Sequence, residues 1–312
     1  MVVTGGAGFL GTRLIQRLLA SSPPAASIVC VDTVRSPIMD PRVQSRVGDV
    51  TDAAFVNDVM RTGPRAVWHL AAVLSGQSEQ EFEFGLAVNL QGTRTLLDAC
   101  RDRPQAPRFV FASTIAVFGG PLPAVVPEDF VLRPQSTYGT AKAMAELLVL
   151  EYTRRGIADG VVCRVPTVAI RPGVPNSAMS SFVSGIVREP LAGMPSVCPV
   201  PLDTPLWVSS PDVTTRNLAH AARVESAALG PVRTVNLPGI TVTPADLLAS
   251  LERAAGAAAV SRVRLEPDER ISRVVATWPG AFDVTRALDL GFERDRDADA
   301  IVTEYMRHAP QR

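Results

Sequence analysis

A tyrosine and a lysine lie four positions apart in the segment TYGTAKAMAE, residues 137–146. Lys142 is the chain's one lysine, and Tyr138 is one of its three tyrosines. Residues four apart in a helix share a face, so a phenol and an ammonium would meet there. An ammonium lowers the pKa of a nearby phenol, which could then accept a proton near neutral pH. The alternative is a tyrosine at the edge of the core beside a solvated lysine, and the pair alone does not decide between the two.

Glycines follow the first apolar run in TGGAGFLGTRL, residues 4–14, and three of them, Gly5, Gly8 and Gly11, are spaced as G-x-x-G-x-x-G. Such glycines let the backbone turn sharply and approach a pyrophosphate, whose charge the N–H groups of a helix N-terminus stabilise. Asp32 ends the next apolar run, where a carboxylate accepts hydrogen bonds from ribose hydroxyls and repels a 2′-phosphate. The pattern predicts NAD as the cofactor. The alternative is a plain tight turn and a loop aspartate.

The elements that must position these residues alternate along the chain. Helices are expected over 89–101 and 141–154, between short apolar runs that predict strands at 1–4, 28–31, 66–70, 108–112 and 161–165. This alternation predicts an α/β fold with a Rossmann-type, doubly wound parallel sheet covered on both faces. The first run is short at its start, so we expect the encoded protein to begin a few residues before Met1.

The character of the sequence changes near residue 171, where prolines become frequent. Dense prolines interrupt helices and favour extended loops, which predicts a smaller, irregular C-terminal lobe. We expect residues 1–170 to form an NAD-binding domain and residues 171–312 mainly to bind substrate. A strand and a capped helix near 232–256 are expected to return to the first domain, and a further strand is expected at 262–266.

Composition narrows the class of protein. Lys+Arg and Asp+Glu balance at 31 each, so no net field attracts nucleic acid. No apolar run approaches the roughly 18 residues of a membrane span. The four cysteines lack a C-x-x-C pair and the three histidines are dispersed, so we expect buried thiols, no metal site and a cytoplasmic location.

Six motifs occur in the order and at the spacing of the extended short-chain dehydrogenase/reductase family, also called the NAD-dependent epimerase/dehydratase family, which this chain resembles over nearly its whole length. The segments that carry the resemblance are TGGAGFLG, GDV at 48–50, HLAAV at 69–73, VNLQGT at 88–93, FASTIAVFGG at 111–120 and YGTAK at 138–142. One departure is Phe118, where a tyrosine is usual.

The resemblance implies roles for particular residues. Tyr138 is the expected general acid/base, Lys142 lowers its pKa and holds the nicotinamide ribose, and Thr114 bonds the reacting oxygen. Family positions that line the dinucleotide correspond to Gly5, Gly8, Phe9, Leu10, Gly11, Asp32, Asp49, Val50, Leu70, Ala71, Ala72, Val73, Asn89 and Pro166, besides Tyr138 and Lys142. The family also implies a homodimer formed through helices 89–101 and 141–154.

Further segments indicate a branch of the family. Residues 69–79 and 277–292 resemble the L-threonine dehydrogenase branch, while 109–127, 171–194 and 198–211 resemble more closely the branch that oxidises D-erythronate at C2 to a 2-oxo acid. This implies a small sugar acid as substrate. Candidate substrate residues are Ser75, Ser113, Thr114, Tyr138, Thr167, Arg171, Asn176, Ser177, Arg188 and Trp278.

Several alternatives remain open at this point. Either arginine could pair with the acid or be structural, and Trp278 could wall the pocket or pack in the core. The enzyme could also be a nucleotide-sugar epimerase or dehydratase, or resemble L-threonine dehydrogenase. A dinucleotide sensor without catalysis is a third class, although it would be expected to lack the Tyr/Lys/Thr set.

Overall fold

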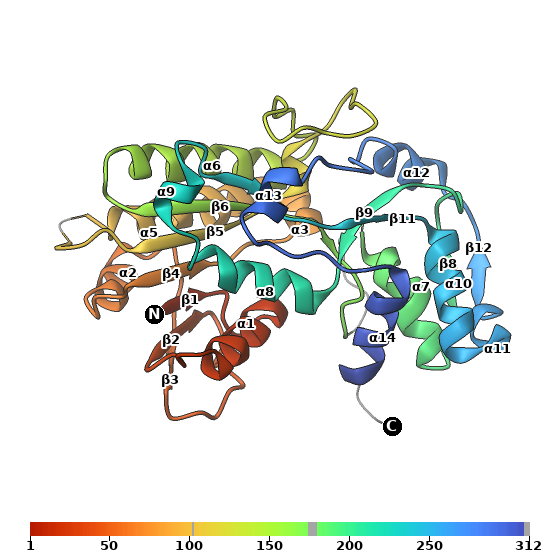
Figure 1. Cartoon of the computed structure of the whole chain (residues 1–312), viewed down its shortest axis with the longest axis horizontal. Coiled ribbons are helices and arrows are strands. Elements are labelled where there is room, and N and C mark those ends of the chain that lie inside the picture. Colours follow the sequence, from red (N-terminus) through yellow and green to blue (C-terminus); the bar gives the residue numbers. More distant parts are fainter. Residues whose placement is uncertain (102, 174–179, 309–312) are drawn as a thin grey trace.

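The computed structural model describes residues 1–101, 103–173 and 180–308 (Figure 1). Its main sheet has seven strands in the order β10-β6-β5-β4-β1-β2-β3, and every pairing is parallel. The strands are β1 (Val2–Thr4), β2 (Ile28–Asp32), β3 (Val43–Val47), β4 (Ala66–His69), β5 (Arg108–Thr114), β6 (Asp159–Val165) and β10 (Thr234–Asn236). The predicted doubly wound sheet is confirmed. Strand β3 was not predicted, because it lies at the edge of the sheet and its partly exposed residues do not form an apolar run in the sequence.

Helices cover both faces of this sheet (Figure 1). On one face, α1 (Phe9–Ala20) packs against α8 (Pro211–Ala221), and the indole N–H of Trp68 donates to Leu218 O at 2.8 Å. The other face carries α2 (Ala53–Met60), α5 (Gly92–Asp98) and α6 (Thr137–Arg154). Shorter turns join them: α3 (Ser75–Gln80), α4 (Phe82–Leu86), the π-helical turn η1 (Ala87–Gln91), the 3₁₀ turn η2 (Ile115–Val117), α9 (Ser226–Leu229) and α13 (Thr285–Asp289).

Helix α6 begins at Thr137, four residues earlier than its apolar pattern predicted. Ser136 precedes it in extended conformation, and its hydroxyl accepts a hydrogen bond from Gly139 N at 3.0 Å. A serine at this position satisfies one of the free N–H groups of the first turn. Tyr138 and Lys142 therefore lie in the first turns of one helix, as expected.

The smaller lobe is more regular than expected. One sheet joins β7 (Thr167–Val168), β9 (Leu206–Ser209) and β11 (Ile240–Val242), and a second pairs β8 (Ser196–Cys198) with β12 (Val263–Leu265). Its helices are α7 (Ser181–Leu191), α10 (Pro244–Ala255), α11 (Ala257–Val260), α12 (Glu269–Val275) and α14 (Ala298–His308). The expectation that prolines favour loops here holds for Pro172, Pro195, Pro199, Pro201 and Pro205, which lie outside helices and strands, and it is wrong for Pro190 and Pro211. Pro190 lies near the end of α7, while Pro211 and Pro244 start their helices, where no intrahelical N–H is needed.

The second half of the chain contributes elements to both lobes. Strand β10 joins the main sheet beside β6, but the following helix α10 packs against α7 and α14 in the smaller lobe, contrary to the expected return of that helix. The helix from the second half that does cover the main sheet is α8. Among the described residues, no helix is both long enough and apolar enough to cross a membrane.

Candidate active site

The end of β5 meets one face of α6, and this contact assembles the residues that the sequence singled out. Lys142 is buried, and its ammonium donates to the carbonyl of Ala112 at 2.9 Å. The hydroxyls of Thr114 and Tyr138 are hydrogen-bonded to each other. The side chain of Thr114 also accepts from Ala116 N at 3.1 Å, which fixes its rotamer at the start of η2. The structure thus brings Tyr138, Lys142 and Thr114 together.

The predicted effect of Lys142 on Tyr138 is corrected by the structure. Burial raises the pKa of Tyr138 to about 12, and the influences that lower it are the hydrogen bond with Thr114 and the charge of Arg171. The Lys142 ammonium lies 5.8 Å from the centre of the Tyr138 ring and points at the Ala112 carbonyl. Burial also lowers the pKa of Lys142 to about 7. Desolvation therefore outweighs the attraction that the four-residue spacing suggested.

Ser113 does not join this group through its hydroxyl. Its side chain is buried and donates to the Glu146 carboxylate, which also forms an ion pair with Arg164 at 2.8 Å. Glu146 and Arg164 were not identified from the sequence. Two signals were available: Glu146 continues the four-residue spacing of Tyr138 and Lys142, and Arg164 interrupts the apolar strand VVCRV.

The glycine loop forms a cradle that side chains would fill. Gly5 has a φ of +66°, and a Cβ there would lie 2.7 Å from Ala71 N. A Cβ on Gly11 would lie 2.1 Å from the Gly5 carbonyl oxygen. Gly8 precedes α1 without a side-chain cap, so the first N–H groups of the helix face the loop uncovered by a side chain. The fit is that of a dinucleotide phosphate site, because backbone N–H groups and a helix N-terminus stabilise a pyrophosphate.

Asp32 is joined to this cradle. One carboxylate oxygen accepts from Ala7 N at 3.0 Å and the other from Thr33 N at 2.7 Å. The carboxylate is therefore fixed at the end of β2 beside the loop, where the ribose of a dinucleotide would lie.

The other expected cofactor residues lie along the same edge of the sheet. Asp49 is exposed and accepts from Thr51 N at 2.8 Å, while Val50 is buried against Gly92. Asn89 is fully buried, and its amide bonds both the N–H and the carbonyl of Val73. Asn89 thereby holds the loop after β4. That loop starts with Leu70, Ala71 and Ala72, which are half-buried. Pro166 is buried directly after β6. Phe9 and Leu10 are the first residues of α1.

The two candidate arginines differ sharply in their surroundings. The guanidinium of Arg188 is buried, donates to the Arg171 carbonyl at 2.8 Å and pairs with Glu189 at 2.5 Å. Arg171 is half-buried, and burial and the charge of Arg188 lower the pKa of its guanidinium, while Tyr138 raises it. Within residues 1–173 and 180–308, apart from 102, no carboxylate pairs with Arg171. Arg171 is thus a cation near the phenol without an acidic partner in that part of the chain.

The remaining substrate candidates are dispersed. Ser75 is half-buried at the start of α3. Glu79 of the same helix accepts a hydrogen bond from the N–H of Thr137 at 2.5 Å, so α3 contacts the start of α6 next to Tyr138. Thr167 is half-buried on β7, and Trp278 packs against the core of the smaller lobe. Asn176 and Ser177 lie outside the described residues.

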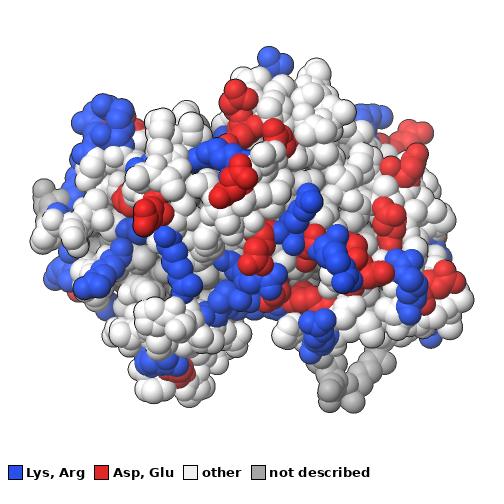
Figure 2. All heavy atoms as spheres, in the orientation of Figure 1, with Lys and Arg blue, Asp and Glu red and all other residues white. Residues whose placement is uncertain are grey.

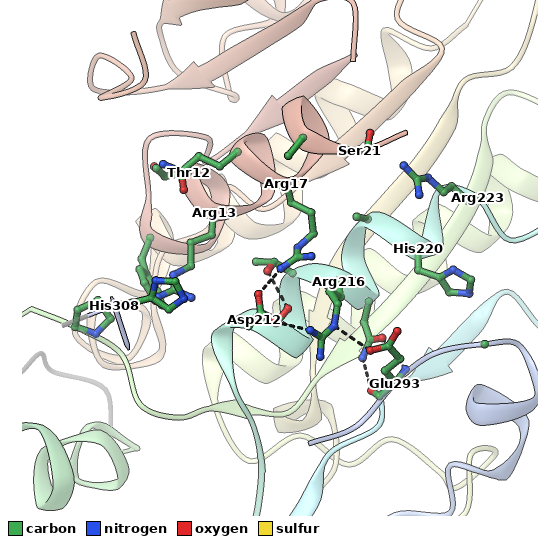
Figure 3. Close-up of a pocket in the computed structure, with 18 residues that line it drawn as sticks. Thr12, Arg13, Arg17, Ser21, Asp212, Arg216, His220, Arg223, Glu293 and His308 are labelled. Carbon is green, nitrogen blue, oxygen red and sulfur yellow. Dashed lines mark hydrogen bonds and ion pairs between the residues drawn. The ribbon is translucent and has the colours of Figure 1, made fainter. Parts of the chain in front are cut away.

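A hollow of about 860 Å³ lies elsewhere, between α1, α8 and the last loop of the chain (Figure 3). Tyr138, Lys142 and Thr114 do not line it. Several of its charged side chains pair with one another: Asp212 pairs with both Arg17 and Arg216, and Arg216 also pairs with Glu293 at 2.9 Å (Figure 3). Figure 2 shows the same interleaving of acidic and basic side chains over the middle of that face. We therefore assign no chemistry to this hollow.

Residues 1–205 match the NAD dependent epimerase/dehydratase family. The chain belongs to this family. The expected resemblance is thus confirmed, and so is NAD as the cofactor of the family's dinucleotide site.

Relatives within the family extend over the full chain. The D-erythronate dehydrogenase of Cupriavidus necator is 44% identical over 318 residues, which covers 99% of this chain and 98% of that protein. The D-erythronate dehydrogenase of Haemophilus influenzae is 40% identical over 311 residues and covers 99% of both chains. A solved nucleoside-diphosphate-sugar epimerase from Agrobacterium tumefaciens has a TM-score of 0.94 at 36% identity, covering 99% of this chain and 93% of that one.

The cofactor preference of this family member leads to a testable prediction at Asp32. We expect Asp32→Asn to raise kcat/KM for NADP relative to NAD by roughly 10–10²-fold, because the variant keeps the acceptor for Ala7 N but removes a charge that repels a 2′-phosphate. The ratio of kcat/KM for the two cofactors measures this. Asp49→Asn is the matched control and should leave the ratio unchanged. Comparable use of both cofactors by the wild type would contradict the assignment.

Proposed function

We propose that this protein is an NAD-dependent dehydrogenase that oxidises the C2 hydroxyl of a small sugar acid, D-erythronate, to 2-dehydro-D-erythronate. The observation that carries the proposal is Arg171, a half-buried guanidinium that acts on Tyr138 and has no acidic partner among the described residues. A buried charge without a partner is costly, and a substrate carboxylate would neutralise it. The full-length relatives named D-erythronate dehydrogenase support the same substrate.

In this proposal Tyr138 reacts as the phenolate: once the phenol has lost its own proton, its oxygen accepts the proton of the C2 hydroxyl. Thr114, whose hydrogen bond lowers the pKa of Tyr138, orients the oxygen of the same C2 hydroxyl. NAD, which the glycine cradle and Asp32 would hold, would supply the acceptor for the hydride that leaves C2. Lys142 holds the nicotinamide ribose and takes part in the proton transfer.

We also propose which part of the chain binds the cofactor and which part binds the substrate. Residues 1–170 hold the dinucleotide and residues 171–312 mainly hold the substrate, with Ser75, Thr167, Arg171, Asn176, Ser177 and Trp278 as the contributing side chains. Support comes from the cradle at Gly5–Gly11 and from Arg171, which begins the second part. The structure gives Arg188 and Ser113 partners inside the protein, so we assign them support of the site rather than contact with substrate.

We further propose a cytoplasmic homodimer. Exposed apolar side chains gather on two adjacent helices: Phe82 and Phe84 on α4, and Met144 and Leu147 on α6, where Leu147 is 64% exposed. A second copy would cover them. Light scattering of the purified protein tests the assembly, and a monomeric mass would contradict it. The cytoplasmic location is supported by the four buried thiols, which suit a reducing compartment.

The substrate proposal predicts one NADH per molecule of D-erythronate oxidised. A site that bonds each hydroxyl of a short polyol should reject an analogue lacking one of them by as much as ~10⁴-fold, because a buried polar group would be left unpaired. L-threonine should be a poor substrate, since an ammonium would replace the C2 hydroxyl near the Arg171 cation. NADH absorbance with a panel of four-carbon acids measures the preference.

A nucleotide-sugar epimerase is the second candidate, favoured by the solved epimerase of 36% identity. It predicts steady turnover of a nucleoside-diphosphate sugar without net NADH. That result, together with no NADH from any four-carbon sugar acid, would replace the dehydrogenase proposal.

A further inference from the structure

We propose that Glu146 is a positioning residue: Ser113 and Arg164 fix its carboxylate one helical turn beyond Lys142, and this fixed carboxylate holds the ammonium of Lys142 in its place against β5. The inference rests on the proposed catalytic role of Lys142, but the experiment that tests it uses no substrate. Glu146 lies one helical turn beyond Lys142 on α6, and it has no direct role in the proposed chemistry.

The geometry ties three consecutive residues of β5 to three residues of α6 that are four apart. Ala112 accepts from Lys142, Ser113 donates to Glu146, and Thr114 bonds Tyr138. The second of these contacts lies outside the reacting group, yet it fixes the register of the other two. Since a strand end and a helix face are each rigid, one fixed contact constrains its neighbours.

The carboxylate of Glu146 is almost fully buried and accepts hydrogen bonds from three donor atoms of two residues. Arg164 donates to it through Nη2 at 2.8 Å and through Nε at 3.1 and 3.2 Å, and Ser113 donates to Oε1. Arg164 is itself fixed by the Glu128 carbonyl at 3.2 Å and by the Phe118 ring, whose centre lies 4.8 Å from the guanidinium carbon. A buried pair with this many hydrogen bonds holds its geometry.

The charge of Glu146 acts on a lysine that burial otherwise discharges. Desolvation lowers the pKa of Lys142 to about 7, and Glu146 is the charge that raises it. The other titratable groups facing Lys142 from the described elements are Tyr138 on α6 and His69 on β4. Burial lowers the pKa of His69 to about 3, so its ring is neutral, and the phenol of Tyr138 keeps its proton. Neither can replace the carboxylate near neutral pH.

The single lysine makes a direct test possible. Protein labelled with ¹³C at the lysine ε carbon gives one lysine resonance, and its chemical shift against pH reports the protonation of Lys142 alone. We expect a wild-type midpoint near pH 7. In Glu146→Gln the midpoint should fall by at least about one pH unit, and Glu146→Asp, which keeps the charge, should restore most of it.

Two further variants separate this role from a purely structural one. Glu146→Gln leaves Arg164 buried without its partner and should lower Tm, whereas Glu146→Gln with Arg164→Met removes both charges and should recover Tm while the midpoint stays low. Glu151→Gln, on the same helix but exposed and paired with Arg154 and Arg155, is the matched control and should not move the midpoint. The proposal is overturned if Glu146→Gln titrates like the wild type, or if the double variant regains the wild-type midpoint along with its Tm.

Discussion

Tyr138→Phe should lower kcat by at least ~10²-fold, the scale of a missing general acid/base, while the affinity for NAD stays near that of the wild type. The variant removes one hydroxyl from a half-buried ring and leaves the cradle and Lys142 in place. Removal of this hydroxyl takes away the group that receives the C2 proton and the partner of Thr114. Steady-state kinetics together with NAD titration by tryptophan fluorescence measures both quantities.

Tyr152→Phe is the matched control for this prediction. Tyr152 lies near the other end of α6, where its hydroxyl donates to Asp98 at 2.5 Å and accepts from Arg101. Its replacement should leave kcat within a few-fold of the wild type. If Tyr138→Phe retained most of the activity, another base would have to be sought, and the assignment of the acid/base would fall.

Arg171→Leu should lower kcat/KM for the sugar acid by roughly 10²–10³-fold, the scale of a charge-assisted hydrogen bond in a partly buried site. Because the carboxylate is bound in both the ground and the transition state, we expect most of the effect to appear as a higher KM. The charge of Arg171 also lowers the pKa of Tyr138, so the variant should move the ascending limb of the pH profile to higher pH. Initial rates over a range of substrate and pH measure both effects.

Arg188→Leu separates a binding arginine from a structural one. Its guanidinium supports the Arg171 carbonyl and pairs with Glu189, so the variant should lower Tm because it leaves a buried carboxylate without a partner. An unchanged KM in Arg171→Leu would show that the acid binds elsewhere.

The features predicted from the sequence are those encoded locally. The glycine spacing and Asp32 depend on one strand, one turn and one helix, and the Tyr138–Lys142 spacing depends on one helix. The sign of the Tyr138 pKa shift could not be predicted this way, because desolvation depends on how much of the fold covers the phenol.

Contacts between elements that are distant in the chain could not be predicted from the sequence either. Ser113 stands next to Thr114 and was grouped with it at the substrate, but its hydroxyl meets Glu146, 33 residues away in the chain. Arg171 and Arg188 looked equivalent in one proline-rich segment. Only the fold shows that Glu189 neutralises Arg188. The regularity of the smaller lobe was missed because its short strands β8 and β9 stand between prolines, and because Pro190 lies near the end of α7, where it does not break the helix.

The crossing of the chain between its two lobes constrains how the protein can be synthesised. A chain that had left the ribosome only as far as residue 170 would have β6 without β10, and the indole of Trp68 would lack the carbonyl of Leu218. The apolar face of α1 would also lie open to water until α8 arrives. The nucleotide-binding half therefore cannot be completed during translation before residues up to Asn236 have emerged, and the exposed edge must be protected from aggregation until then.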